Sequence, residues 1–190
     1  MPRRTTRPEQ LADAALEVLG SSGSHGLTHR RVDAAAGVPA GTTSNYFGSR
    51  DAILRAAANR LLELQLADLN QTSDGGRPGS RDDLEKVIAA LAVVAEGAGR
   101  ARYLAREELA LESSRRPELA NLMRELRAVT VRQQTLLLRA AGLDVSEERV
   151  DWLGSLLTGV ALDRLTLGVP GGDLTALIRI VCAALLTPGE

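Results

Sequence analysis

The sequence predicts an all-α protein with an N-terminal three-helix helix-turn-helix head and a larger C-terminal helical domain. Two observations predict it. Apolar residues recur at the spacing of one helix face along most of the chain, and no segment shows strand-like alternation. Capping and turn residues divide residues 28–50, THRRVDAAAGVPAGTTSNYFGSR, into two short helices joined by a tight turn. We expect roughly nine helices, with the head at residues 1–48 and the larger domain at residues 49–190.

The first helix of the head begins at a capping box. Thr6 and Glu9 have the spacing at which each side chain reaches the other residue's backbone N–H, and Pro8 is tolerated in the first turn. The apolar residues that follow predict the buried side of this helix: Leu11, Ala15, Val18 and Leu19.

The next two helices form the turn motif. The Thr28 hydroxyl can cap the second helix, and Gly37 ends it where a left-handed residue is needed. The predicted apolar face of this helix consists of Val32, Ala35 and Ala36. The third helix is expected at about residues 40–46.

In such a motif the second short helix lies in the DNA major groove. We assign Thr43 and Phe47 to the core, because they are four residues apart on one side of the helix. Tyr46 then points away and can donate to a phosphate, while the Asn45 amide can pair with adenine. The predicted DNA-binding residues are Thr28, Arg30, Ala40, Gly41, Thr42, Ser44, Asn45, Tyr46 and Arg50. An ordinary helical corner in a bundle is the alternative interpretation.

Further helices follow the head, and Ser49 and Ser146 are expected to cap two of them. Their expected ranges are 49–70, 80–95, 100–112, 117–141, 146–167 and 173–187. A low-complexity loop, TSDGGRPGS, is predicted at residues 72–80.

Charge distinguishes the head from the rest of the chain. Residues 1–60 carry eight arginines and five acidic residues, a net charge of +3, whereas the whole chain has a net charge of −1. A basic head is typical of a protein that presents one end to nucleic acid, although solvated surface charge gives the same asymmetry. The basic arm at residues 3–7 can reach the DNA minor groove; a terminus without a function is the alternative.

Several classes of protein are disfavoured. Cys182 is the only cysteine, so neither an intrachain disulfide nor a zinc cluster is expected. No apolar run is long enough to span a membrane and the N-terminus lacks a signal peptide, so we expect a cytoplasmic protein. His25 and His29 are the only histidines, and no catalytic motif is present. We therefore expect no enzyme activity, no metal and no cofactor.

The head resembles the DNA-binding domain of the TetR family of bacterial transcriptional regulators. The resemblance rests on Leu11, Ala14, Ala15, Val18, Gly23, Gly26, Thr28, Arg30, Val32, Ala36, Gly37, Val38, Gly41, Thr42, Tyr46, Phe47 and Ser49. The family commonly has lysine, leucine and tyrosine at the positions of Ala40, Thr43 and Ser44, and a small apolar residue at the position of Asp33. The resemblance implies a double-stranded DNA operator. Because of these differences, the base sequence of that operator does not follow from the operators of other family members.

A homodimer is predicted through the last two helices, at residues 146–167 and 173–187. Small residues beside leucine faces allow close helix approach there, and a symmetric dimer reads two half-sites about 34–36 Å apart. The resemblance implies the same pairing. In a monomer these helices could instead pack on each other.

The resemblance also implies a small-molecule inducer held between the head and the dimer helices. Polar or aromatic residues expected to face that core are Tyr103, Arg106, Met123, Thr130, Gln133 and Trp152. The low aromatic content favours an apolar or lipid-like ligand. We expect a repressor that this ligand releases from its operator. For Arg106 the alternative is a solvated ion-pair face with Glu107 and Glu108. For the whole protein, the alternative is a constitutive or protein-partner-regulated DNA-binding protein without a ligand.

Overall fold

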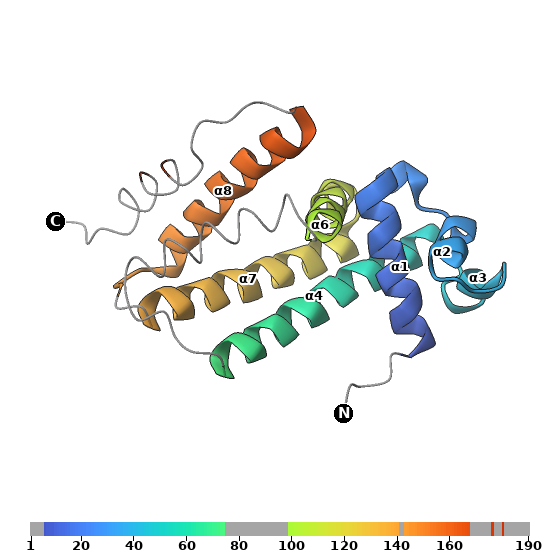
Figure 1. The fold of residues 1–190 in the computed structure, drawn as a ribbon, viewed down its shortest axis with the longest axis horizontal. Helices are drawn as coiled ribbons and strands as arrows, with labels where there is room; N and C mark the ends of the chain where they lie inside the picture. Colours follow the sequence, from blue (N-terminus) through green and yellow to red (C-terminus); the bar gives the residue numbers. More distant parts are fainter. Residues whose placement is uncertain (1–5, 75–98, 141–142, 168–175, 177–179, 181–190) are drawn as a thin grey trace. The chain divides into compact units, whose positions relative to one another are not determined.

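The computed structural model describes residues 6–74, 99–140, 143–167, 176 and 180 (Figure 1). Within these residues the protein is helical and contains no strand, as predicted. The elements are α1 (Arg7–Ser22), the 3-10 turn η1 (Ser24–Gly26), α2 (His29–Ala35), α3 (Thr42–Tyr46), α4 (Arg50–Asp74), α6 (Arg100–Ser113), α7 (Pro117–Ala140) and α8 (Glu147–Leu167). The helices predicted at 80–95 and 173–187 lie outside the described residues, apart from residues 176 and 180. The predicted count of nine is therefore not matched by the seven α-helices in the described ranges.

The predicted caps are present at four helices. Thr6 and Glu9 form the capping box of α1, and the Thr28 hydroxyl accepts a hydrogen bond from the Arg31 N–H. Two serine hydroxyls do the same for the first turns of α4 and α8, Ser49 at 3.1 Å and Ser146 at 3.3 Å. Local sequence therefore fixes where these helices begin.

Helix α4 runs further than predicted. The sequence predicts an end near Asn70 and a loop from Thr72, but the backbone remains helical through Asp74. The residues between are polar yet include neither glycine nor proline, and Gly75 is the first strong helix breaker after them. The predicted start of the loop is therefore wrong, and the rest of that loop lies outside the described residues.

The described residues form two compact units. The first contains residues 6–66 and 99–127, and the second contains residues 67–74, 128–140 and 143–167. In the first unit the predicted inner face of α1 is buried, together with side chains of α4, α6 and α7. The fully buried members of this core include Leu11, Ala15, Leu19, Leu27, Val32, Ile53, Leu54, Ala57, Ala105, Leu109 and Leu119. The head thus shares one core with α6 and the start of α7.

Helix α6 approaches α1 closely within this unit (Figure 1). A Cβ atom placed on Gly20 would lie 2.1 Å from the carbonyl oxygen of Ala101, closer than any real contact allows. Because the obstructing atom is backbone, only glycine permits this approach. Gly20 therefore lets α6 lie directly against the head.

In the second unit, the end of α7 is tied to the chain that leads into α8. The Arg139 guanidinium donates two hydrogen bonds to the Val145 carbonyl, at 2.9 and 3.1 Å. The apolar side chains at and just after this link are buried: Val145, Val150 and Leu153. No helix in the described ranges has the length and hydropathy that a membrane span requires.

Candidate nucleic-acid interface

A tight turn with two left-handed glycines connects α2 to α3. Gly37 has φ +63° and ends α2 as predicted, and Gly41 has φ +91° at the start of α3. Helix α3 has only five residues, and its N-cap residue, Gly41, has no side chain that could cap it. An isolated helix of this length is unstable in water, so contacts from outside must hold it in place.

Asp33 supplies such contacts at the start of α3. Its side chain is 3% exposed. One carboxylate oxygen accepts from the Gly41 N–H at 2.7 Å; the other accepts from the Thr43 N–H at 2.7 Å and the Thr43 hydroxyl at 2.5 Å. Burial tends to raise the pKa of Asp33, but the hydrogen bonds from Thr43 and Gly41 outweigh it and the pKa is lowered. Asp33 is therefore an ionised, fully satisfied buried carboxylate.

This arrangement corrects the predicted inner face of α2. Val32 is fully buried and Ala36 packs against the core, as expected, but Ala35 is exposed. Asp33 occupies the inner position because it has hydrogen-bond donors to satisfy it there. A buried carboxylate is not predicted by the sequence, since acidic residues are rarely buried without partners and the partners come from α3.

The other end of α3 is held by His29 and by the core. The His29 Nε2 atom lies 2.6 Å from the Phe47 carbonyl oxygen and donates to it, because a carbonyl oxygen only accepts. Thr43 is completely buried and Phe47 packs against the core, as predicted for both. This role of His29 is not visible in the sequence, because its partner Phe47 lies 18 residues further along the chain.

The opposite side of α3 faces solvent. Ala40, Gly41, Ser44, Asn45 and Tyr46 are exposed and Thr42 is partly exposed. The Ser44 and Thr42 hydroxyls donate locally, to the Gly41 carbonyl at 2.8 Å and the Pro39 carbonyl at 2.6 Å. The Asn45 side chain makes no hydrogen bond within the described part of the chain. Donors, acceptors and the Tyr46 ring are therefore presented together on a surface of small residues.

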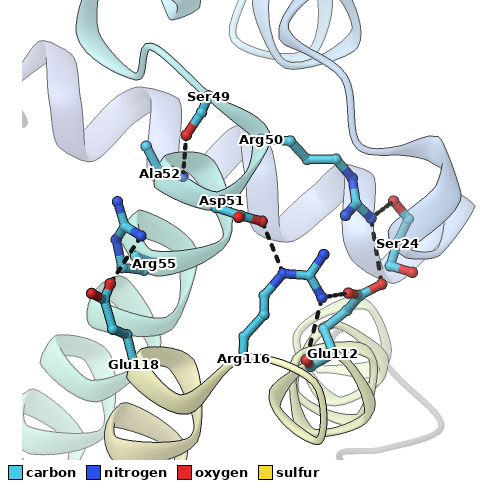
Figure 2. A network of polar contacts seen from close by, with 9 residues as sticks. All are labelled: Ser24, Ser49, Arg50, Asp51, Ala52, Arg55, Glu112, Arg116 and Glu118. Carbon is cyan, nitrogen blue, oxygen red and sulfur yellow. Dashed lines mark hydrogen bonds and ion pairs between the residues drawn. The ribbon is translucent and has the colours of Figure 1, made fainter.

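The remaining predicted contact residues lie at the ends of neighbouring helices. Thr28 is exposed while it caps α2, and the exposed Arg30 forms no ion pair with any described residue. Arg50 is more constrained than predicted. Its Nη2 atom donates to the Ser24 carbonyl at 2.6 Å and lies 3.4 Å from Glu112 of α6 (Figure 2).

Glu112 is the buried centre of an ionic network whose other members are partly exposed (Figure 2). It pairs with Arg50 and with Arg116, and the Arg116 Nε atom donates to Asp51 at 2.8 Å. Hydrogen bonding from the Ser24 side chain, together with the charges of Arg116 and Arg50, lowers the pKa of Glu112 despite its burial. These charges join the start of α4 to the end of α6 and to Arg116 in the turn that follows it.

A second carboxylate of α6 reaches the same loop. Glu108 accepts a hydrogen bond from the Ser24 backbone N–H at 2.8 Å. Both polar groups of the Ser24 backbone are therefore held from outside η1, one directly by α6 and one through Arg50. The sequence carried one unused signal, since residues 108 and 112 are acidic and share a helix face.

The predicted ligand-binding residues are distributed over both units. In the first unit Tyr103, Arg106 and Met123 are partly buried; in the second Thr130 and Gln133 are buried. The expectation that Trp152 faces the core is wrong, because its side chain is 53% exposed.

The alternative interpretation of Arg106, an ion-pair face with Glu107 and Glu108, stays a prediction. Arg106 forms no ion pair with a described residue, and Glu108 contacts Ser24 instead. Glu107 is partly buried, and that burial raises its pKa although Arg106 and Arg127 lower it. Among the described residues, no group of His, Cys, Asp or Glu side chains could hold a metal ion.

Comparison with known families matches most of the chain. Residues 11–57 match the family described as bacterial regulatory proteins, tetR family. Residues 79–188 match the family described as tetracyclin repressor-like, C-terminal domain. The HTH-type transcriptional regulator BetI of Burkholderia ambifaria is 32% identical over 87 residues, which are 46% of this chain and 45% of BetI. The match thus spans less than half the length of that relative.

Solved structures resemble the whole chain. The multidrug binding protein EbrR complexed with ethidium is 26% identical with a TM-score of 0.71, covering 96% of this chain and all of EbrR. A TetR-family member from Streptomyces coelicolor A3 is 27% identical with a TM-score of 0.69, covering 97% of this chain and 100% of that one. A transcriptional regulator from Rhodococcus sp. Rha1 is 27% identical with a TM-score of 0.68, covering 95% and 92% of the two chains.

Proposed function

Because the chain belongs to the TetR family of DNA-binding transcriptional regulators, we propose that it is a homodimeric, cytoplasmic repressor that a small apolar molecule releases from its operator. The head would bind DNA and the region beyond residue 48 would bind the ligand and form the dimer. The observation that carries the proposal is the solvent-facing side of α3, held from behind by buried Asp33.

The proposed readers of base edges are Thr42, Ser44 and Asn45. The Asn45 amide has the donor and acceptor that a bidentate contact with adenine requires, and it is exposed. Ala40 and Gly41 have small side chains or none, so the α3 backbone can approach the groove. The proposed phosphate contacts come from Thr28, Arg30, Tyr46 and Arg50, and these fix the register of the head on the duplex.

Dimerisation through α8 is supported by its exposed apolar side chains. Trp152 and Leu156 lie one turn apart and are 53% and 52% exposed, and Leu167 is 71% exposed. The small residues Ser155 and Gly159 are exposed near them on the same helix. A surface of this kind is costly in water unless a partner covers it. We therefore assign Trp152 to the dimer face; the other proposed partner helix, at 173–187, lies largely outside the described residues.

Ligand release requires a link from the body to the head, and α6 provides one within the first unit. Tyr103 and Arg106, two proposed ligand contacts, lie on the helix that also carries Glu108 and Glu112. Movement of α6 would pull on Ser24 directly and on Arg50 through Glu112. A coupling of about 1–3 kcal/mol gives a 5- to 150-fold change in DNA affinity. The complex of EbrR with ethidium supports the proposal of a small-molecule ligand for this chain.

Selection of bound duplexes from random DNA tests the proposal. We expect an enriched palindrome whose half-sites are about 10 base pairs apart, centre to centre, or a multiple of that distance. Absence of any enriched sequence contradicts the proposed function. An enriched single half-site bound by one chain contradicts the dimer while preserving the DNA-binding head.

A further inference from the structure

Two polar side chains on one face of α2 hold the two ends of α3. His29 and Asp33 are four residues apart and so lie one above the other on the helix. Asp33 accepts hydrogen bonds at the start of α3, from the Gly41 and Thr43 N–H groups at 2.7 Å each. His29 donates to the Phe47 carbonyl at the end of α3, at 2.6 Å. We call this pair the α2 clamp.

Helix α3 depends on contacts of this kind. A helix leaves its first four N–H groups and last four C=O groups without internal partners, and α3 has only five residues. Its N-cap is a glycine without a side chain, so Asp33 satisfies from outside what a capping residue would normally satisfy. Thr43 adds a buried hydroxyl that donates to the same carboxylate.

We infer that His29 and Asp33 are positioning residues that set the orientation of α3 on α2 and thereby determine its base specificity. The inference rests on the proposed function of α3 as the DNA-reading helix. Asp33 is 3% exposed and cannot itself touch DNA, so its effect on binding passes through α3. An α3 held at both ends presents Ser44 and Asn45 at one angle to the groove, and small misplacements of a bidentate contact lose its discrimination.

The variants follow from the hydrogen bonds. Asp33→Asn keeps the shape but turns an N–H₂ group toward the N–H donors of α3, so a hydrogen bond is lost there. Thr43→Val removes only the hydrogen bond from the Thr43 hydroxyl to Asp33. It is the milder variant to use if Asp33→Asn does not fold. His29→Ala removes the tie to Phe47, and His29→Gln keeps a donor of similar reach and is expected to restore it. Glu17→Gln is the matched control, because Glu17 is an exposed head residue and its loss changes the net charge equally.

Hydrogen exchange of the free protein tests the clamp without DNA. In Asp33→Asn we expect the Gly41 and Thr43 amides, which donate to Asp33, to exchange at least about tenfold faster, because their charged acceptor is lost. In His29→Ala we expect the same at Phe47, the last hydrogen-bonded amide of α3. Glu17→Gln and His29→Gln should leave these rates unchanged. Unchanged exchange in Asp33→Asn and His29→Ala overturns the clamp.

The second measurement is the ratio of affinities for the duplex selected by the wild type and for a shuffled duplex. We expect Asp33→Asn and His29→Ala to lower this ratio about tenfold or more while the salt dependence of binding stays unchanged, since no phosphate contact is removed. At temperatures well below the melting temperature, a variant that only destabilised the fold would leave this ratio of affinities unchanged. An unchanged ratio, or a changed ratio without faster exchange, overturns the inference. If the wild-type protein shows no preference for the selected duplex over the shuffled one, the proposed function is contradicted instead. The hydrogen-exchange data then still show whether the α2 clamp holds α3.

Discussion

The Glu108 carboxylate on α6 accepts a hydrogen bond from the backbone N–H of Ser24, 84 residues earlier in the chain, at 2.8 Å. The Ser24 carbonyl accepts from Arg50, which in turn pairs with Glu112 one turn further along α6. Two carboxylates of α6 therefore act on one residue of the loop between α1 and α2. The proposed route from ligand to DNA depends on this loop.

Glu112 should matter far more to stability than Glu118, although each pairs with arginine. The Glu112 side chain is 8% exposed and that of Glu118 is 76% exposed. We expect Glu112→Gln to lower the free energy of unfolding by about 2 kcal/mol, because bonds to two arginines weaken in a buried site. The control, Glu118→Gln, should change it by less than about 0.5 kcal/mol. Urea denaturation measures both, and equal effects would contradict the structural role of the buried Glu112.

Stability should fall in acid because of Asp33 and Glu112. Both have pKa values lowered in the folded protein from their usual values of 3.8 and 4.5. The folded state then binds fewer protons than the unfolded state in acid, so the contribution is complete above about pH 4.5 and is lost as the pH falls through the folded-state values. Urea denaturation at pH 7, 5 and 3.5 should show little change between the first two and a marked loss at the third. The double variant Asp33→Asn, Glu112→Gln should lose less on acidification than the wild type, and an equal loss would count against these assignments.

Gly41 should not tolerate a side chain, whereas Gly48 should. Gly41 has φ +91°, and nothing lies within 4 Å of a Cβ placed on Gly48, which is outside the positive φ range. Gly41→Ala should cost about 1–2 kcal/mol of unfolding free energy, the penalty for a non-glycine residue in this region. Gly48→Ala should stay within about 0.5 kcal/mol of the wild type. A neutral Gly41→Ala would mean that the turn relaxes without strain.

The exposed face of α8 should control the oligomeric state. Leu156→Arg places a charge beside Trp152 on the proposed dimer face and should weaken the dimer about 30-fold or more. Leu111→Arg is the control, because Leu111 is 66% exposed on α6, outside that face. Light scattering at micromolar concentration should report a monomer for the first variant and a dimer for the second. A wild-type monomer, or a dimer that persists in Leu156→Arg, would contradict the assignment.

Features set by neighbouring residues could be predicted from the sequence. The caps at Thr6, Thr28, Ser49 and Ser146 depend on side chains and N–H groups three residues apart, and all four are present. Gly37, the left-handed glycine that follows α2, is likewise a local feature that could be predicted from the sequence. The resemblance in the head, carried by such local features, correctly indicated the family.

Features that depend on packing between distant segments could not be predicted from the sequence. The role of Asp33 requires Gly41 and Thr43 to come within hydrogen-bond distance, and a single acidic residue in the sequence of α2 reads as exposed. An aromatic residue such as Trp152 is expected in the core because aromatic residues are usually buried, yet it is exposed on α8.

The most direct test of the account compares the affinities of the wild type and Asn45→Ala for the selected duplex and for its shuffled counterpart, over a range of salt concentrations. The wild type should prefer the selected duplex by about a thousandfold or more. Asn45→Ala should lose about 1–3 kcal/mol on the selected duplex only, with an unchanged salt slope, whereas Arg30→Ala should weaken both duplexes and reduce the slope by about one. Equal affinity of the wild type for both duplexes, or an Asn45→Ala variant with undiminished preference, would contradict the claim that α3 reads DNA sequence.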